Sequence, residues 1–144
     1  MLRGIAGFIG GVIGGLIKLL IDQIGFTINI STADTVGTVS QVLYGGAEKL
    51  PFISWSIYIL IAGLVGWIIS KIVPKEYTAK FFSSGVITGV ILWIIMNTIF
   101  AFSKSIIPTW LMGFGTFIVN LLSHIILGIV IMYTVSRTQI EETD

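Results

Sequence analysis

The hydrophobic pattern of the chain consists of four long apolar runs, separated by segments that contain proline or polar residues. Each run is roughly 20 residues long, which is the length an α-helix needs to cross the hydrocarbon core of a bilayer. The pattern therefore predicts membrane-spanning helices over residues 4–25, 52–73, 79–102 and 109–135. Proline begins or ends helices and is disfavoured inside them. The chain places its prolines at predicted boundaries, at Pro51, Pro74 and Pro108.

The first connection, residues 26–50, is the only long one, and it has a helical pattern of its own. Ser31 and Thr32 are typical helix caps. Apolar residues follow them at helical spacing, at Val36, Val39, Val42, Leu43 and Ala47. We predict a short amphipathic helix over residues 33–44, ended by Gly45 and Gly46, that lies on the bundle or in the membrane interface.

The predicted fold class is an all-α membrane protein, with residues 1–144 forming a single transmembrane domain. It is a four-transmembrane-helix bundle with a short interfacial helix in the first outer loop. The acidic segment 138–144 is predicted to be a frayed tail. Composition agrees, because 55% of the residues are hydrophobic, only 10% are charged and the mean hydropathy is +1.02. The expected environment is therefore the lipid bilayer.

Several classes of function are excluded by residue types that the chain lacks. The net charge is only +1 and no basic stripe is present, so we expect no nucleic-acid partner. With no cysteine and a single histidine, we expect no disulfide, no metal site and no cofactor. Gly-x-Ser-x-Gly and His-Glu-x-x-His motifs and paired intramembrane aspartates are also missing, so we predict no catalytic residues and no enzyme.

The positive charges predict the orientation of the chain. Five of them fall on one side of the predicted topology, namely Arg3, Lys71, Lys75, Lys80 and Arg137. Only Lys49 and Lys104 fall on the other side. Because cytoplasmic loops carry the excess of lysine and arginine, both termini are predicted to be cytoplasmic.

Glycine recurs along one face of the first span. Small residues at every third or fourth position let a neighbouring helix approach closely in lipid. We assign helix packing to four of these positions, Gly7, Gly11, Gly14 and Gly15. Gly10 lies at the margin of the stripe and is predicted to tolerate a larger side chain better than Gly11.

Polar residues inside the spans form the candidate site. Lys18 and Asp22 lie in the outward half of the first span, and the predicted topology places Asn97, Asn120 and His124 at comparable depth. Charge at membrane depth is costly and is therefore interpreted as functional by default, here as an ion or proton site. The alternative is a self-satisfied lysine–aspartate pair that snorkels outward, with the asparagines as interhelical hydrogen-bond partners. Histidine titrates near neutrality, which makes His124 the natural proton carrier unless it is a hydrogen-bonded core residue.

Several stretches of the chain have a recognisable pattern, namely residues 7–18 with Asp22, residues 62–66 with 73–75, residues 85–89, and Ser123-His124 with the apolar run that ends at Arg137. Together they resemble the YagU-like family of small bacterial inner-membrane proteins, and the YqhR-like membrane proteins are an alternative relative. The resemblance implies four spans in a bacterial inner membrane. It also implies a link to acid tolerance, without implying a biochemical activity.

Two functions are compatible with these observations. The leading hypothesis is an accessory or structural membrane protein, with a membrane-protein partner or as a homo-oligomer, whose polar cluster senses or moves protons or small cations. The alternative is an oligomeric small transporter or channel subunit. The two differ because a pathway should conduct ions in reconstituted vesicles, whereas an accessory protein should not.

The orientation can be measured with topology reporters. A reporter fused after Asp144, or inserted after Pro74, should give a cytoplasmic signal, and one inserted near Gly45 should give an external signal. A cytoplasmic signal from the Gly45 site would contradict the predicted number of spans before it.

Overall fold

The computed structural model describes residues 2–45, 51–103 and 106–140, and these residues form helices joined by turns. The long helices are α1 (Leu2–Thr27), α3 (Pro51–Ile72), α5 (Phe81–Ser103) and α6 (Phe114–Ile140). The short ones are α2 (Thr35–Tyr44), α4 (Lys75–Thr78) and the 3-10 helix η1 (Thr109–Leu111). Each of the four long helices is long and apolar enough to span a membrane, so the predicted all-α membrane bundle is confirmed.

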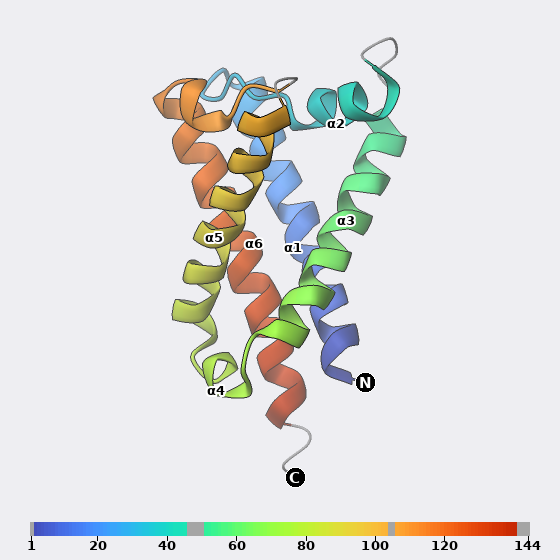
Figure 1. The fold of residues 1–144 in the computed structure, drawn as a ribbon, viewed down its shortest axis with the longest axis vertical. Helices are drawn as coiled ribbons and strands as arrows, with labels where there is room; N and C mark the ends of the chain where they lie inside the picture. Colours follow the sequence, from blue (N-terminus) through green and yellow to red (C-terminus); the bar gives the residue numbers. More distant parts are fainter. Residues whose placement is uncertain (1, 46–50, 104–105, 141–144) are drawn as a thin grey trace.

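The long helices pack in the spatial order α3, α1, α6, α5, as Figure 1 shows. In this order α1 and α6 are the inner pair, and α3 and α5 the outer pair. Helix α2 lies across one end of the bundle, which we call the α2 end. Helix α4, the start of α1 and the end of α6 lie at the opposite end, which we call the terminal end.

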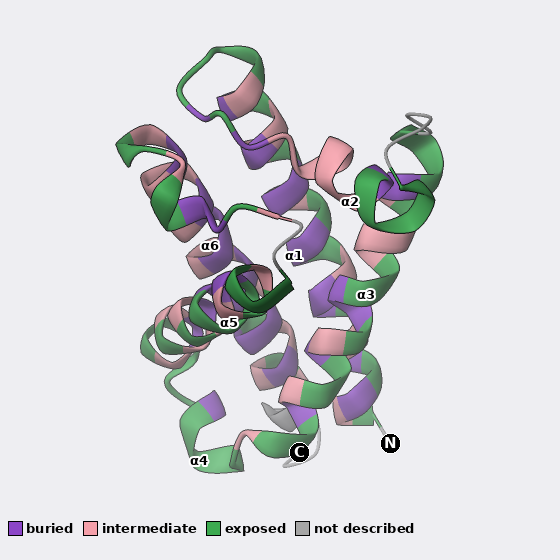
Figure 2. Cartoon of the chain, turned by 45° about the horizontal axis from the view of Figure 1, so that its top comes forward, coloured by how far each residue is buried: buried purple, intermediate pink, exposed green. Residues whose placement is uncertain are grey.

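Burial follows from this order. In the most apolar window of each long helix, the buried share is 50% in α1 and 39% in α6, against 28% in α3 and 22% in α5. Figure 2 shows the buried residues concentrated on the inner pair. The apolar core is a cluster of buried residues on α6, namely Leu127, Ile131 and Val135. Partly buried residues of two other helices pack against it, Ile69 of α3 and Leu92 of α5.

The boundaries of the predicted spans needed correction mainly at the fourth. Its predicted first residues instead form η1, and Gly113 adopts a φ of 100°, which breaks the helix before Phe114. Helix α6 continues to Ile140, so residues 138–140 are helical rather than frayed, and residues 141–144 lie outside the described residues. The third span begins at Phe81 because α4 occupies the preceding turn.

The predicted amphipathic helix is present as α2, although its first residue and its cap differ. Asp34, not Ser31 or Thr32, caps it by accepting a hydrogen bond of 2.8 Å from the backbone N–H of Gly37. Gly45 ends the helix with a φ of 66°, as predicted, whereas Gly46 lies outside the described residues. The buried residue of α2 is the polar Ser40, its apolar residues Val36 and Val39 are half-buried, and Val42 and Leu43 are exposed.

The glycines of α1 serve two interfaces rather than one. Gly7, Gly11 and Gly15 face α3, where an added Cβ at Gly11 would meet the carbonyl oxygen of Ala62. Gly14 instead faces Leu127 of α6. Gly10 also lies in an interface, because it faces α6 and an added Cβ would meet the side chain of Thr134 and lie 3.0 Å from Ile131 Cα. Its greater tolerance relative to Gly11 stays a prediction.

The two glycine interfaces differ in how easily they can adjust. At Gly11 an added methyl group meets backbone, including Gly63 Cα at 2.9 Å, whereas at Gly14 the nearest atom is the mobile Cδ1 of Leu127, also at 2.9 Å. Gly11→Ala should therefore lower the free energy of unfolding by about 1–3 kcal/mol relative to Gly14→Ala, with equal gains in helix propensity. Unfolding in detergent measures both. Equal stabilities would contradict the backbone contact between α1 and α3.

Candidate functional site

The centre of the candidate site is an ion pair within α1. Lys18 Nζ lies 2.5 Å from Asp22 Oδ2, and each side chain is only 3% exposed. The two residues are one helical turn apart and continue the buried face that the glycines begin. The pair is therefore self-satisfied, as one interpretation of the sequence held, but it does not snorkel to the surface.

Asp22 also binds two neutral side chains from other helices. Its Oδ1 accepts a hydrogen bond of 2.7 Å from Ser123 Oγ on α6, and its Oδ2 accepts one of 3.0 Å from Thr35 Oγ1 on α2. One carboxylate thus connects α1, α2 and α6. On the α3 side, Lys18 Nζ lies 5.5 Å from the centroid of the Tyr58 ring, a cation–π distance.

The turn after α1 brings Thr35 to Asp22. Asn29 adopts a φ of 59°, and the N–H groups of Ile30 and Ser31 both donate to the carbonyl of Gly25, so the chain doubles back at the end of α1. The backbone N–H of Thr32 then donates to Thr116 Oγ1 of α6 at 2.9 Å. These bonds direct the chain back across the bundle, and α2 begins directly over the ion pair.

A second polar cluster joins α5, η1 and α6. Asn97 Oδ1 accepts hydrogen bonds of 2.7 Å from both the backbone N–H and the hydroxyl of Thr109. The same hydroxyl lies 3.2 Å from Asn120 Oδ1. Asn97 Nδ2 donates to the carbonyl of Trp93 on its own helix at 2.9 Å, while its Oδ1 holds η1 to the bundle.

The backbone of Asn120 connects the two clusters. Ser123 Oγ lies 3.0 Å from the carbonyl oxygen of Asn120, and His124 Nδ1 lies 2.7 Å from the same oxygen. His124 is buried and close enough to Lys18 for the two to interact electrostatically. The polar groups therefore form one continuous network from Lys18 to Asn97.

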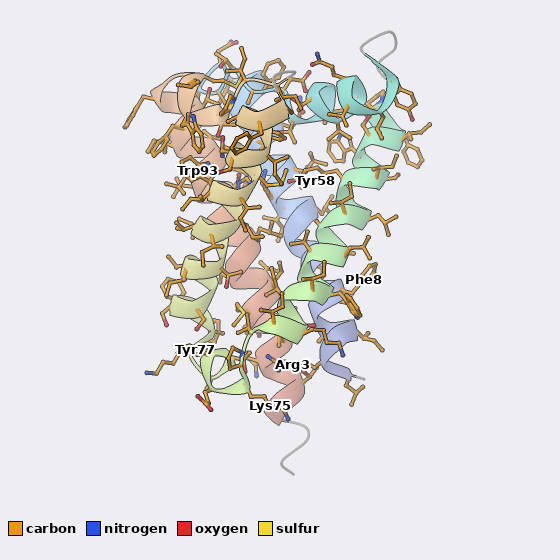
Figure 3. The ribbon with its side chains drawn as sticks, in the orientation of Figure 1. Arg3, Phe8, Tyr58, Lys75, Tyr77 and Trp93 are labelled. Carbon is orange, nitrogen blue, oxygen red and sulfur yellow. The ribbon has the colours of Figure 1, made fainter. Side chains whose placement is uncertain are left out.

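Aromatic rings surround the second cluster. Trp93 packs edge-on against Trp110 and Phe117, with ring centroids 5.9 Å and 5.3 Å away. Figure 3 places Trp93 and Tyr58 in the half of the bundle nearer α2, and Arg3 and Lys75 at the terminal end. The polar network therefore lies on the α2 side of the bundle.

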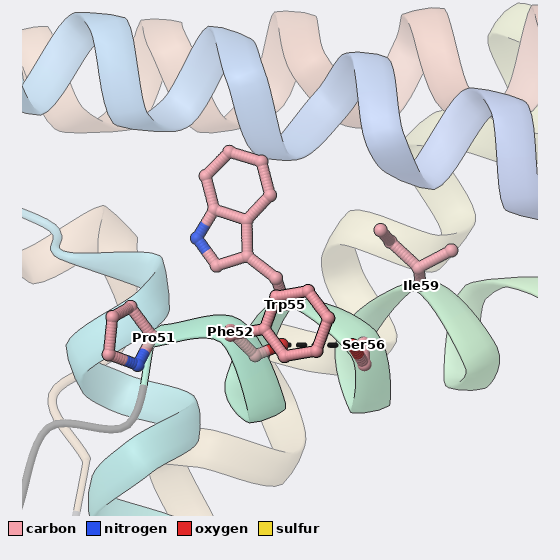
Figure 4. A pocket seen from close by; sticks show the side chains of 5 residues that line it. All are labelled: Pro51, Phe52, Trp55, Ser56 and Ile59. Carbon is pink, nitrogen blue, oxygen red and sulfur yellow. Dashed lines mark hydrogen bonds between the residues drawn. The ribbon is translucent and has the colours of Figure 1, made fainter.

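A shallow surface pocket lies apart from these groups. Figure 4 shows that the first turns of α3 line it. The lining residues are Pro51, Phe52, Trp55, Ser56 and Ile59. Its lining is almost entirely apolar, and it contains none of the charged residues of the network. We assign it no role in the site.

The structure buries all five polar residues predicted for the site. It brings Lys18 and Asp22 into contact and joins Asn97 to Asn120 through Thr109. The hydrogen bond of His124 is to its own helix. Sequence reasoning missed Thr35 and Thr109, because a threonine in a connection carries no pattern that reveals which distant side chain it contacts.

Comparison of the chain with protein-family models, curated proteins and solved structures found no match. The resemblance to YagU-like proteins therefore stays a prediction, and functional inference rests on the geometry of the network.

The role of Asn97 can be tested by removing its acceptor. Asn97→Leu leaves the buried N–H of Thr109 without a partner and should lower the free energy of unfolding by about 1–3 kcal/mol. The control, Thr109→Val, keeps the backbone bond and should have a smaller effect. Thermal unfolding in detergent compares them, and a larger loss in the control would contradict the proposed role.

Proposed function

We propose that this protein is an accessory or structural membrane protein whose Lys18–Asp22 centre senses or moves protons or small cations. The observation that carries the proposal is the burial of an ion pair whose carboxylate is bound from three helices. Both members of the pair exchange protons in principle. A change in the charge of either one therefore alters contacts between helices.

Stability alone is a poor explanation for this pair. Lysine precedes aspartate along α1, which is the weaker order for a helical ion pair. Replacing a buried ion pair by apolar residues is often neutral or stabilising, because removing two charges from water is costly. Helix packing alone gives no reason for placing these residues at this depth, which supports a role that depends on charge.

The contacts of Asp22 suggest how such a role would operate. Loss of the negative charge would weaken the bonds from Lys18, Thr35 and Ser123 together. Thr35 is the first residue of α2, and Ser123 lies on α6. The position of α2 over the bundle would then depend on whether the centre is charged.

For the location of the protein we propose a bacterial inner membrane with both termini in the cytoplasm. The start of α1 and the end of α6 lie at the same end of the bundle, together with Arg3 and Lys75 (Figure 3). Positive charge on that side favours the cytoplasm. The resemblance to YagU-like proteins supports the bacterial assignment and a link to acid tolerance.

The alternative is an oligomeric transporter or channel subunit. Toward the terminal end, the described helices enclose apolar side chains between α3, α5 and α6, including Leu127 and Ile131. This arrangement favours the accessory role for a single chain, because the polar network does not continue through these apolar side chains. Steady ion flux in vesicles that contain the purified protein would instead favour the alternative.

A double-mutant cycle tests the charged centre. Lys18→Met and Asp22→Leu should each lower the free energy of unfolding by about 3–5 kcal/mol, because each leaves the other charge buried without its partner. The double variant should lose much less than the sum. Unfolding in detergent at two salt concentrations gives the coupling, and small, additive and salt-sensitive effects would contradict a buried centre.

A further inference from the structure

The Asp22 carboxylate binds the Lys18 ammonium group and hydroxyl groups from two other helices. Asp22 Oδ2 lies 2.5 Å from Lys18 Nζ, and Thr35 Oγ1 lies 3.0 Å from the same carboxylate oxygen. Ser123 holds the other carboxylate oxygen at 2.7 Å from α6. Ser123 thus orients the carboxylate through Oδ1, while Oδ2 is shared by the Lys18 ammonium group and the Thr35 hydroxyl group.

We infer that a small monovalent cation, with Na⁺ as the representative, competes with the Lys18 ammonium group for Asp22. This inference rests on the proposed function and names the ion that the centre takes. In the cation-bound state, Asp22 Oδ2 and Thr35 Oγ1 coordinate the ion. The Thr35 hydroxyl, which now donates to Asp22, then uses a lone pair as a ligand, since a hydroxyl group both donates and accepts.

Charge balance selects a monovalent ion. Asp22 supplies one negative charge, and among the described residues no cluster of three histidine, cysteine or acidic residues is present to hold a metal ion. A divalent ion would leave an uncompensated positive charge in a buried site, which is costly. Carboxylate and hydroxyl oxygens are hard ligands and suit a hard cation.

The exchange is balanced by one proton. The starting state holds a protonated Lys18 and an ionised Asp22. In the product state the cation sits on Asp22, Lys18 is a neutral amine, and one proton has passed to water. The site carries the same total charge before and after, and the Tyr58 ring lies 5.5 Å from Nζ.

Lys18 is the proton donor in this exchange, and the other groups that face the centre are neither bonded to Asp22 as a cation nor charged partners of it. They are Tyr58 on α3 and His124 on α6, while α2 contributes the neutral Thr35. His124 hydrogen-bonds the carbonyl of Asn120 and not Asp22. His124→Gln should therefore leave the pH dependence of cation binding unchanged, whereas a change at Lys18 should remove it.

The test is cation binding by detergent-purified full-length protein, followed as the rise in melting temperature with NaCl against choline chloride at equal ionic strength. For the wild type we expect a specific rise with Na⁺, and an apparent affinity that increases by up to about tenfold per pH unit, since one proton leaves per ion. At neutral to alkaline pH, where Asp22 is ionised, Lys18→Met should bind Na⁺ more tightly and without pH dependence. Asp22→Asn should show no difference between the two salts.

A second measurement keeps the inference testable if Lys18→Met fails to fold. Adding NaCl to the weakly buffered wild type should release about one proton per bound ion, and Thr35→Val should reduce the affinity while keeping this ratio. Equal responses to Na⁺ and choline in the wild type, with no proton release, would overturn the inference. The proposed function would survive that result if the double-mutant cycle still showed coupling, and would fall with it if the cycle were additive.

Discussion

Close approach of helix backbones is the interaction on which the rest of this structure depends. Lipid supplies no hydrophobic force that drives apolar helices together, so their association relies on packing and on hydrogen bonds between helices. At Gly11 of α1, an added side-chain carbon would meet the backbone of α3. At Gly128 of α6, an added side-chain carbon would likewise meet the backbone of α5, at Gly85 and Gly89. These contacts hold the helices in the order α3, α1, α6, α5.

The buried ion pair is a consequence of that packing. Because α1 is an inner helix, the face that carries glycine near its first residue carries Lys18 and Asp22 further along, and both are enclosed. Enclosure requires partners, since no water is present in the bilayer core to bind the charges. Ser123 and Thr35 supply them, and they tie α6 and α2 to α1 in doing so.

The two ends of the bundle therefore differ in character. Hydrogen bonds between side chains of different helices hold the α2 end together, including the 2.7 Å contact between Ser40 of α2 and Ser54 of α3. Apolar packing around Leu127 and Ile131 holds the part of the bundle nearer the terminal end. A polar region is easier to rearrange by a change of charge than an apolar core, because its contacts depend directly on the ionisation of Asp22. The α2 end is accordingly where we place the function.

The sequence by itself determined the number of spans, most of their boundaries and five of the buried polar residues. It could do so because the length of an apolar run and the position of proline act locally. Helical periodicity also defined a glycine face on α1, but periodicity does not say which helix a face meets. Only the tertiary structure shows that this face contacts two helices, with Gly11 against α3 and Gly14 against α6. It alone brought Thr35 and Ser123 to Asp22, because these contacts join segments that are far apart in the chain and depend on the path of each turn.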